Sequence, residues 1–223
     1  MKKKILLLPI LSLALCGCTI QDLMFWKKKD EDSNQKDNDE SKKEEQPEEE
    51  TDNRNKRTVT ISFCDDAFKI ITSGEAGYVF ADHPESINEY VSSKAGGDDY
   101  LSGFEFENLN TAVYKSVLYL CVGTGYYANS KFKEGSFTWT SKKDIYDIEI
   151  KVKAYSKLDS GGSTDIQSVA WIDNESVSLN CESTADPESK VKSVKYANGT
   201  KQFTVKATGS RVMLEYLKIS WEA

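Results

Sequence analysis

Histidine is almost absent from this sequence, which limits the chemistry that the chain can perform. The single histidine, His83, stands directly before Pro84. A Ser-His-Asp or Cys-His catalytic site has to be built around a histidine, and no Gly-x-Ser-x-Gly turn is present to hold a nucleophilic serine. We therefore expect His83 to lie exposed in a loop, and no nucleophilic catalytic site is predicted.

Cysteine pairs with the spacing of metal ligands are also missing. Cys64, Cys121 and Cys181 follow the N-terminal region, and no Cys-x-x-Cys motif occurs. We expect all three to be small apolar core residues, with a single disulfide as the alternative. No metal site and no cofactor is predicted. An excess of basic charge is lacking too, because the net charge is −7, and this disfavours a nucleic-acid partner.

No apolar run in the sequence is long enough to span a bilayer, which takes about 20 residues. The run that comes nearest opens the chain. Lysines at positions 2–4 precede an apolar stretch over residues 5–15, and small residues follow. This order is typical of a secretory signal peptide.

The residues that end this stretch, Leu15-Cys16-Gly17-Cys18, resemble the lipobox of bacterial lipoproteins. The resemblance implies a signal peptide over residues 1–17, diacylglycerol on the thiol of Cys18, and cleavage that leaves Cys18 as the first residue. Two acyl chains hold a protein stably on a membrane. The resemblance therefore implies a membrane partner and a place on the extracytoplasmic face, at the cell surface. An ordinary cleaved signal or an uncleaved helix is the alternative.

Apolar side chains are scarce between the anchor and the remainder of the chain. Residues 27–57 consist mainly of Lys, Asp, Glu, Asn and Gln. Such a segment cannot bury enough apolar surface to offset its ordering entropy. We predict that residues 18–57 form a disordered, charged tether and that residues 58–223 fold as one domain.

Apolar and polar side chains alternate along short segments of this domain, which is the pattern of half-buried strands. In the longest case, from Ile145 to Tyr155, one face carries Ile148 to Ala154 and the other carries Asp147 to Lys153. Shorter segments of this kind cover residues 58–64, 136–140, 177–181 and 203–207, and residues 117–122 are apolar at nearly every position. In the last segment, residues 212–221, the phase changes near Glu215-Tyr216. We expect a β-bulge there, or burial on both faces.

Turn residues separate these segments. Asn198-Gly199, between Tyr196 and Phe203, predicts a hairpin, and Asp173-Asn174 predicts a second turn. One short helix is expected over residues 84–92. Many short strands with polar turns favour an all-β, jelly-roll-like antiparallel β-sandwich.

Four stretches of the sequence resemble jelly-roll modules of secreted and surface proteins from low-GC Gram-positive bacteria. They are residues 118–125, 135–140, 145–155 and 211–221. The resemblance implies a two-sheet jelly roll with an accessory or binding role, and it supplies no catalytic residues.

Two sets of residues are candidates for function. Asp147 and Glu149 lie two apart on one strand and so share a face, as the acid pair of a glycan hydrolase would; Lys151 and Lys153 follow on the same face and favour an ordinary charged surface. Tyr126 and Tyr127 follow Gly123-Thr124-Gly125 in a predicted loop. Exposed aromatic rings there could contact a sugar or a protein.

The remaining aromatic signal is assigned to the core. Trp139, Trp171 and Trp221 lie in predicted strands, and we expect them to be buried. The sequence thus favours a non-catalytic recognition domain for a glycan or a surface protein. A small glycan hydrolase that uses Asp147 and Glu149, and a passive envelope component, are the alternatives.

Overall fold

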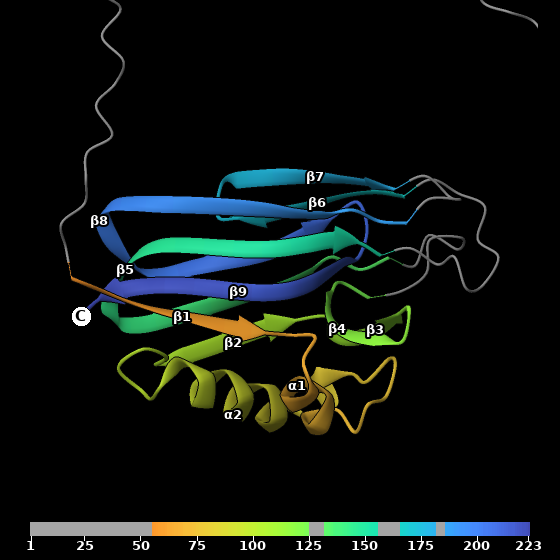
Figure 1. Ribbon diagram of the computed structural model, residues 1–223, viewed down its shortest axis with the longest axis horizontal. Coiled ribbons are helices and arrows are strands. Elements are labelled where there is room, and N and C mark those ends of the chain that lie inside the picture. The colour runs from red at the N-terminus through yellow and green to blue at the C-terminus, as the bar shows by residue number, and fades with distance from the viewer. Residues whose placement is uncertain (1–54, 125–131, 156–165, 182–185) are drawn as a thin grey trace, which may run out of the picture. The chain divides into compact units, whose positions relative to one another are not determined.

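The computed structural model describes residues 55–124, 132–155, 166–181 and 186–223. Its strands are β1 (Lys56–Ser62), β2 (Gly103–Glu107), β3 (Leu109–Tyr114), β4 (Val117–Val122), β5 (Gly135–Ala154), β6 (Ile166–Ile172), β7 (Glu175–Cys181), β8 (Ser189–Thr208) and β9 (Val212–Glu222). The helices are α1 (Asp66–Ile71), α2 (Pro84–Ala95) and the short 3₁₀ helix η1 (Phe80–Asp82). The fold is mostly antiparallel β-sheet with few helices, as the sequence predicts (Figure 1).

Two long strands, β5 and β8, connect the two layers of the sandwich. The hydrogen-bonded strand order is β3-β4-β9-β5-β8-β6-β7, with β1 paired to β9 and β2 paired to β5. Residues 145–153 of β5 pair with β9 and with the first half of β8, and form the first layer with β1, β3 and β4. Residues 135–140 of β5 pair with β2 and with the second half of β8, and form the second layer with β6 and β7.

The main core lies between the inward faces of these layers. Trp139 of the second layer packs against Trp221 of the first, with 6.2 Å between ring centroids, and against Phe203 at the same distance. Both tryptophans are fully buried, as expected. Burial of such side chains stabilises the fold by about 1.5–3 kcal/mol each relative to leaving them exposed.

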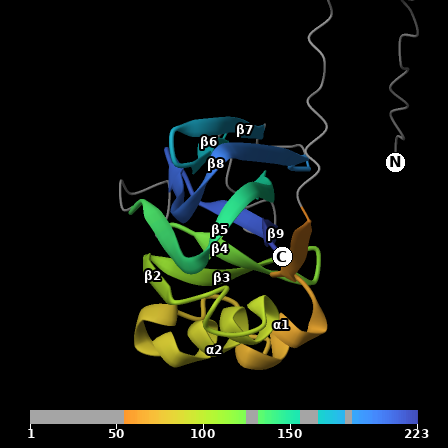
Figure 2. The same cartoon turned by 90° about the vertical axis from the view of Figure 1, so that its left-hand side faces the viewer.

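The helices cover the side of the sandwich next to β1 and β2 (Figures 1 and 2). The predicted helix forms and is longer than expected, since Pro84 begins α2 and Gly96, with φ +91°, ends it. Helix α1 was not predicted. Its N-cap is Asp65, whose carboxylate accepts a hydrogen bond from Phe68 N at 2.8 Å. The buried ring of Phe68 then joins α1 to the core.

The hairpin predicted at Asn198-Gly199 is wrong, because β8 continues through this point. Gly199 has φ +72° and lies opposite the register shift of β5 between Ile145 and Asp147. A Cβ at Gly199 would lie 2.9 Å from Asp144 Cβ. Glycine therefore lets the long strand bend between the layers instead of reversing the chain. The turn predicted at Asp173-Asn174 is confirmed, since it joins β6 to β7.

The β-bulge predicted near Glu215-Tyr216 is also confirmed. Lys151 of β5 pairs with Tyr216 and Val152 pairs with Leu214, so Glu215 is the extra residue of β9. Leu214 and Leu217 are three residues apart and would point to opposite faces of a regular strand. The extra residue makes both point into the core. The bulge also directs the Glu215 side chain to the outward face of the first layer.

The placement of Trp171 contradicts its predicted role as a core residue. In β6, Ala170 and Ile172 are buried, and Trp171 between them is half-buried on the outward face of the second layer. Successive side chains of a strand point to opposite faces, so only every second residue can face the core. In β6 these inward positions belong to Ala170 and Ile172.

The three cysteines do not share one environment. Cys121 is fully buried and Cys181 nearly so, as expected of small core residues, whereas Cys64 is half-buried. Cys64 and Cys121 are free thiols. Burial raises the pKa of Cys121 to about 12, so its thiol is unreactive in the folded chain.

Candidate functional site

The outward face of the first layer gathers charged and hydroxyl side chains from four adjacent strands. Directly opposite residues of antiparallel strands point to the same side, and here Asp147 pairs with Lys195 of β8 and with Ser220 of β9. Glu149 pairs with Ser193 and Lys218 in the same way. We call this surface the charged face: Lys56, Thr58, Asp147, Glu149, Lys151, Lys153, Ser193, Lys195, Glu215, Tyr216, Lys218 and Ser220.

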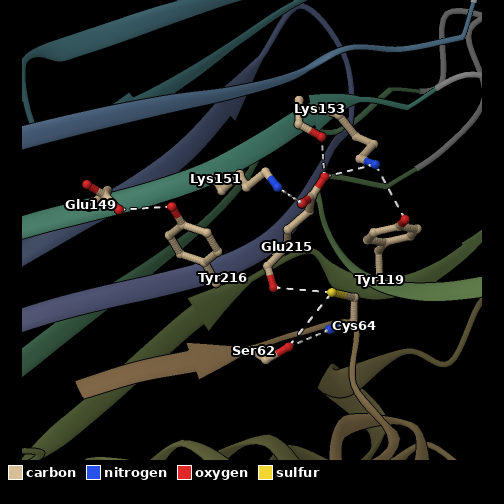
Figure 3. A network of polar contacts seen from close by, with 9 residues as sticks. Ser62, Cys64, Tyr119, Glu149, Lys151, Lys153, Glu215 and Tyr216 are labelled. Atoms are coloured by element: carbon tan, nitrogen blue, oxygen red, sulfur yellow. Dashed lines mark hydrogen bonds and ion pairs between the residues drawn. The ribbon is translucent and has the colours of Figure 1, made fainter.

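Glu149 is held from three sides at the centre of the charged face. Its carboxylate accepts a hydrogen bond from Tyr216 Oη at 2.9 Å (Figure 3). It accepts a second one from Ser193 Oγ at 3.1 Å. Lys218 Nζ lies 3.7 Å from the same carboxylate. Burial and the bond to Glu149 raise the pKa of Tyr216 to about 12, so its hydroxyl remains a donor at neutral pH. The carboxylate is therefore fixed before any ligand arrives.

Asp147 has its own counter-ion. Lys56 Nζ of β1 lies 2.6 Å from Asp147 Oδ2. The structure therefore brings the two predicted acids onto one face but engages each with a separate lysine. A glycosidase acid pair needs one carboxyl that holds a proton, in surroundings away from cations. Neither Asp147 nor Glu149 has such surroundings.

A groove of about 280 Å³ lies over this part of the charged face. Its lining residues come from all four strands: Thr58, Asp147, Ile148, Glu149, Ser193, Lys195, Lys218 and Ser220. Thr58 and Ser220 share a hydrogen bond of 2.8 Å between their hydroxyls. Lys195 makes no ion pair with any described residue. The groove therefore presents acceptors, donors and hydroxyls to solvent at fixed positions.

A second polar network lies beside the groove, at the bulge. The Glu215 carboxylate contacts Lys153 Nζ at 2.8 Å and Lys151 Nζ at 2.9 Å, and accepts a hydrogen bond from Ser189 Oγ (Figure 3). Lys153 also donates to Tyr119 Oη at 3.4 Å. Burial opposes ionisation of Glu215, but these bonds outweigh it, and the pKa of Glu215 lies below its ordinary value. The network fixes the bulge and hence the register of Tyr216 next to it.

The other predicted residues have different outcomes. Tyr126 and Tyr127 lie outside the described residues, as do Cys18 and the residues 1–17 predicted to form a signal peptide. His83 is exposed, as expected, and its ring stacks on Tyr78 with 5.1 Å between centroids. Within the described ranges, no group of His, Cys, Asp or Glu could hold a metal ion. No helix in the same ranges is long and apolar enough to cross a membrane.

Sequence reasoning missed the partners that surround the predicted acids. Tyr216 and Lys218 become neighbours of Glu149 only through the β5–β9 register, and Lys56 reaches Asp147 across β9. The phase change at Glu215 is the one signal that could have located Tyr216, because it marks the bulge that turns this ring outward.

Comparisons with known proteins place the chain in no established family. No family model matches it, and no curated protein matches it by sequence. Among solved structures, it is similar to the CBM36-1 domain of a multidomain xylanase from the hindgut metagenome of Trinervitermes trinervoides. The identity is 13%, over 52% of this chain and 96% of that one, with a TM-score of 0.29.

Other similar structures have equally low scores. A family 35 carbohydrate-binding module from Clostridium thermocellum shows 15% identity over 53% of this chain and 92% of its own, with a TM-score of 0.28. The K1 cleaved adhesin domain of Lys-gingipain from Porphyromonas gingivalis W83 shows 9% identity over 52% and 89%, with a TM-score of 0.33. Scores this low carry no information about a ligand.

Proposed function

We propose that the folded part of this chain is a non-catalytic recognition domain that binds a glycan at the charged face. The observation that carries the proposal is the groove whose carboxylates are held in place by lysines and hydroxyls. Sites that bind small polar molecules combine a concave surface with a few fixed polar groups. This groove combines both features on the rigid centre of a sheet.

A sugar suits this set of groups because each of its hydroxyls both donates and accepts. Asp147 and Glu149 would accept from sugar hydroxyls, and Lys195 and Lys218 would donate to them. Because Tyr216 and Ser193 already fix Glu149, binding would cost little further ordering of that side chain. The two carboxylates act here as acceptors and not as acid and nucleophile.

We further propose that Cys18 is acylated and anchors the domain on the extracytoplasmic face of the membrane through a charged tether that ends before β1, since Lys56 and Arg57 belong to that strand. The support is the lipobox-like sequence and the low apolar content of residues 27–57. Mass spectrometry of the native protein tests this. We expect an N-terminal peptide that begins at Cys18 and carries the added acyl mass, and an unmodified or different N-terminus would refute it.

Binding is tested by titrating the full chain with oligosaccharides in a calorimeter and by screening a glycan array. We expect a ligand whose affinity falls about tenfold or more in Glu149→Gln with Lys195→Met, because the groove loses one fixed acceptor and one donor. Glu89→Gln, an exposed carboxylate on α2, is the matched control and should leave the affinity unchanged. A silent array would contradict the proposal and favour a passive envelope component.

The hydrolase alternative predicts a different result with the same proteins. New reducing ends would be released from a polysaccharide by the unmodified chain and not by Glu149→Gln. We expect binding without release.

A further inference from the structure

The outward face of the second layer is mostly uncharged, in contrast to the charged face, and the ring of Trp171 lies on it. Trp171 of β6 pairs with Ser176 of β7 on one side and with Lys206 of β8 on the other. Lys206 in turn pairs with Ser136 of β5, and Ser136 with Glu107 of β2. Trp171 is therefore one position in a row that crosses all five strands of this layer.

Most of the residues that share this outward face are uncharged hydrogen-bonding residues. They are Ser136, Thr138, Thr140, Gln167, Ser176, Ser178, Asn180, Gln202, Thr204 and Thr208. We call this surface, together with Trp171 and Lys206, the tryptophan platform. It differs from the charged face, where ionised side chains occupy most positions.

Hydrogen bonds between neighbouring strands fix several of these side chains. Thr138 and Thr204 share a bond of 2.9 Å between their hydroxyls, and Gln202 Nε2 donates to Thr140 Oγ1 at 3.1 Å. The indole N–H of Trp171 donates to Thr208 Oγ1 at 3.0 Å. The ring orientation is thus set by the platform itself, before any ligand binds.

The half-buried position of Trp171 has no explanation in core packing. Trp139 and Trp221 fill the interior and are fully buried, whereas Trp171 points away from it. Lys206, its partner across the β6–β8 pair, places Nζ 5.2 Å from the ring centroid. An exposed cation–π contact is weak, so this flexible, exposed side chain can move aside for a ligand.

We infer that the tryptophan platform binds a neutral polysaccharide chain. The C–H face of a pyranose would stack on Trp171, and the surrounding hydroxyls and amides would bond to its hydroxyl groups. Charge complementarity selects the neutral class, because Glu105 and Glu107 at the β2 edge of the platform repel an acidic polymer. This site lies on a different layer from the charged face, so its ligand does not depend on the function proposed there.

Tryptophan fluorescence tests the inference directly. Among the described tryptophans only Trp171 has access to solvent, and a Trp26→Phe background removes the remaining one. In this full-length background we would titrate hexamers of β-1,4-linked glucose, xylose, mannose and N-acetylglucosamine, with oligogalacturonate as the acidic comparison. We expect at least one neutral hexamer to change the emission and to protect the chain from acrylamide quenching, and oligogalacturonate to do neither.

Variants then assign the binding to the platform, with calorimetry as the readout. Trp171→Ala should lower the affinity about tenfold or more, and Trp171→Phe, which keeps a ring, should lower it less. Thr140→Val keeps the side-chain shape and removes one hydroxyl, so it should give a smaller loss than Trp171→Ala without affecting the fold. Ile70→Ala, which removes a 76% exposed apolar side chain from α1, is the matched control and should change nothing.

Three results would overturn the inference. They are the absence of binding by every neutral hexamer, tighter binding of oligogalacturonate, and an unchanged affinity in both Trp171→Ala and Thr140→Val. Loss of binding in Glu149→Gln with Lys195→Met, but not in Trp171→Ala, would assign the sugar to the charged face alone. The proposed function would then stand without the platform.

Discussion

Replacement of Glu215 by Gln should destabilise the fold more than any other isosteric change of a carboxylate on the charged face. The Glu215 side chain is 11% exposed and lies against Lys153, which is 12% exposed, and Lys151, which is 37% exposed. Gln keeps the shape but removes the charge, so Lys153 remains largely buried without a counter-ion.

The expected magnitude follows from this intermediate burial. Breaking a fully buried ion pair by removing one partner costs about 3–5 kcal/mol, and an exposed pair contributes about 0–1 kcal/mol. Because solvent reaches Lys151, we expect Glu215→Gln to lower the free energy of unfolding by about 2–3 kcal/mol. Adding Lys153→Met should restore part of the loss, because the unpaired charge is removed.

Urea unfolding at pH 7, followed by circular dichroism, measures this loss. Glu149→Gln is the matched control, since Glu149 is 27% exposed and its lysine lies 3.7 Å away. It should cost less than about 1 kcal/mol. If Glu215→Gln costs no more than the control, the network does not stabilise the bulge and our reasoning fails.

Three further predictions follow from the same structure. The free energy of unfolding should fall as the pH drops below about 4.5, the ordinary pKa of a glutamate. The reason is that the pKa of Glu215 is lowered in the folded state, so its contribution to stability is lost as it becomes protonated. Urea unfolding at several pH values should show a weaker pH dependence in Glu215→Gln, and an unchanged pH dependence would argue against this role of Glu215. Gly199→Ala should cost about 1–3 kcal/mol, because residue 199 has φ +72° and the new Cβ would lie 2.9 Å from Asp144 Cβ; a thermal midpoint equal to that of the unmodified chain would contradict the bend. In a Cys16→Ala and Cys18→Ala background, half-buried Cys64 should react with a thiol reagent in the native state. Cys121 should react only on unfolding, because it is buried and its pKa is raised. Equal labelling rates of the two thiols in the native state would refute this order.

The parts of the fold that sequence predicted well are those in which local alternation and burial agree. Ile148 to Ala154 alternate with charged residues, and the structure buries them as expected. The bulge at Glu215 was predictable because a strand cannot change phase without an extra residue. Strands β2 and β3 were not predicted. The turn between β3 and β4 consists of Lys115 and Ser116, both with positive φ, and this pair is not one of the Asn-Gly, Asp-Gly or Gly-Gly pairs that predict a two-residue hairpin turn.

Other differences arise where tertiary pairing overrides a local signal. Asn198-Gly199 forms hairpins when both flanking segments pair with each other, but here each half of β8 pairs with β5 instead. Trp171 was expected in the core because it lies in a predicted strand, but Ala170 and Ile172 on either side of it point inward, and Trp171 therefore points outward. The acid pair could be found from sequence spacing alone, but Lys56, Ser193 and Tyr216 come from three other strands.

Parallel measurement of binding and cleavage tests the central claim most directly. The full chain would be incubated with each oligosaccharide that the array identifies, and affinity and new reducing ends would be measured on the same sample. The account predicts a measurable affinity that falls in Glu149→Gln with Lys195→Met, and no new reducing ends. Cleavage that disappears in Glu149→Gln, or an affinity that this pair of substitutions leaves unchanged, would contradict it.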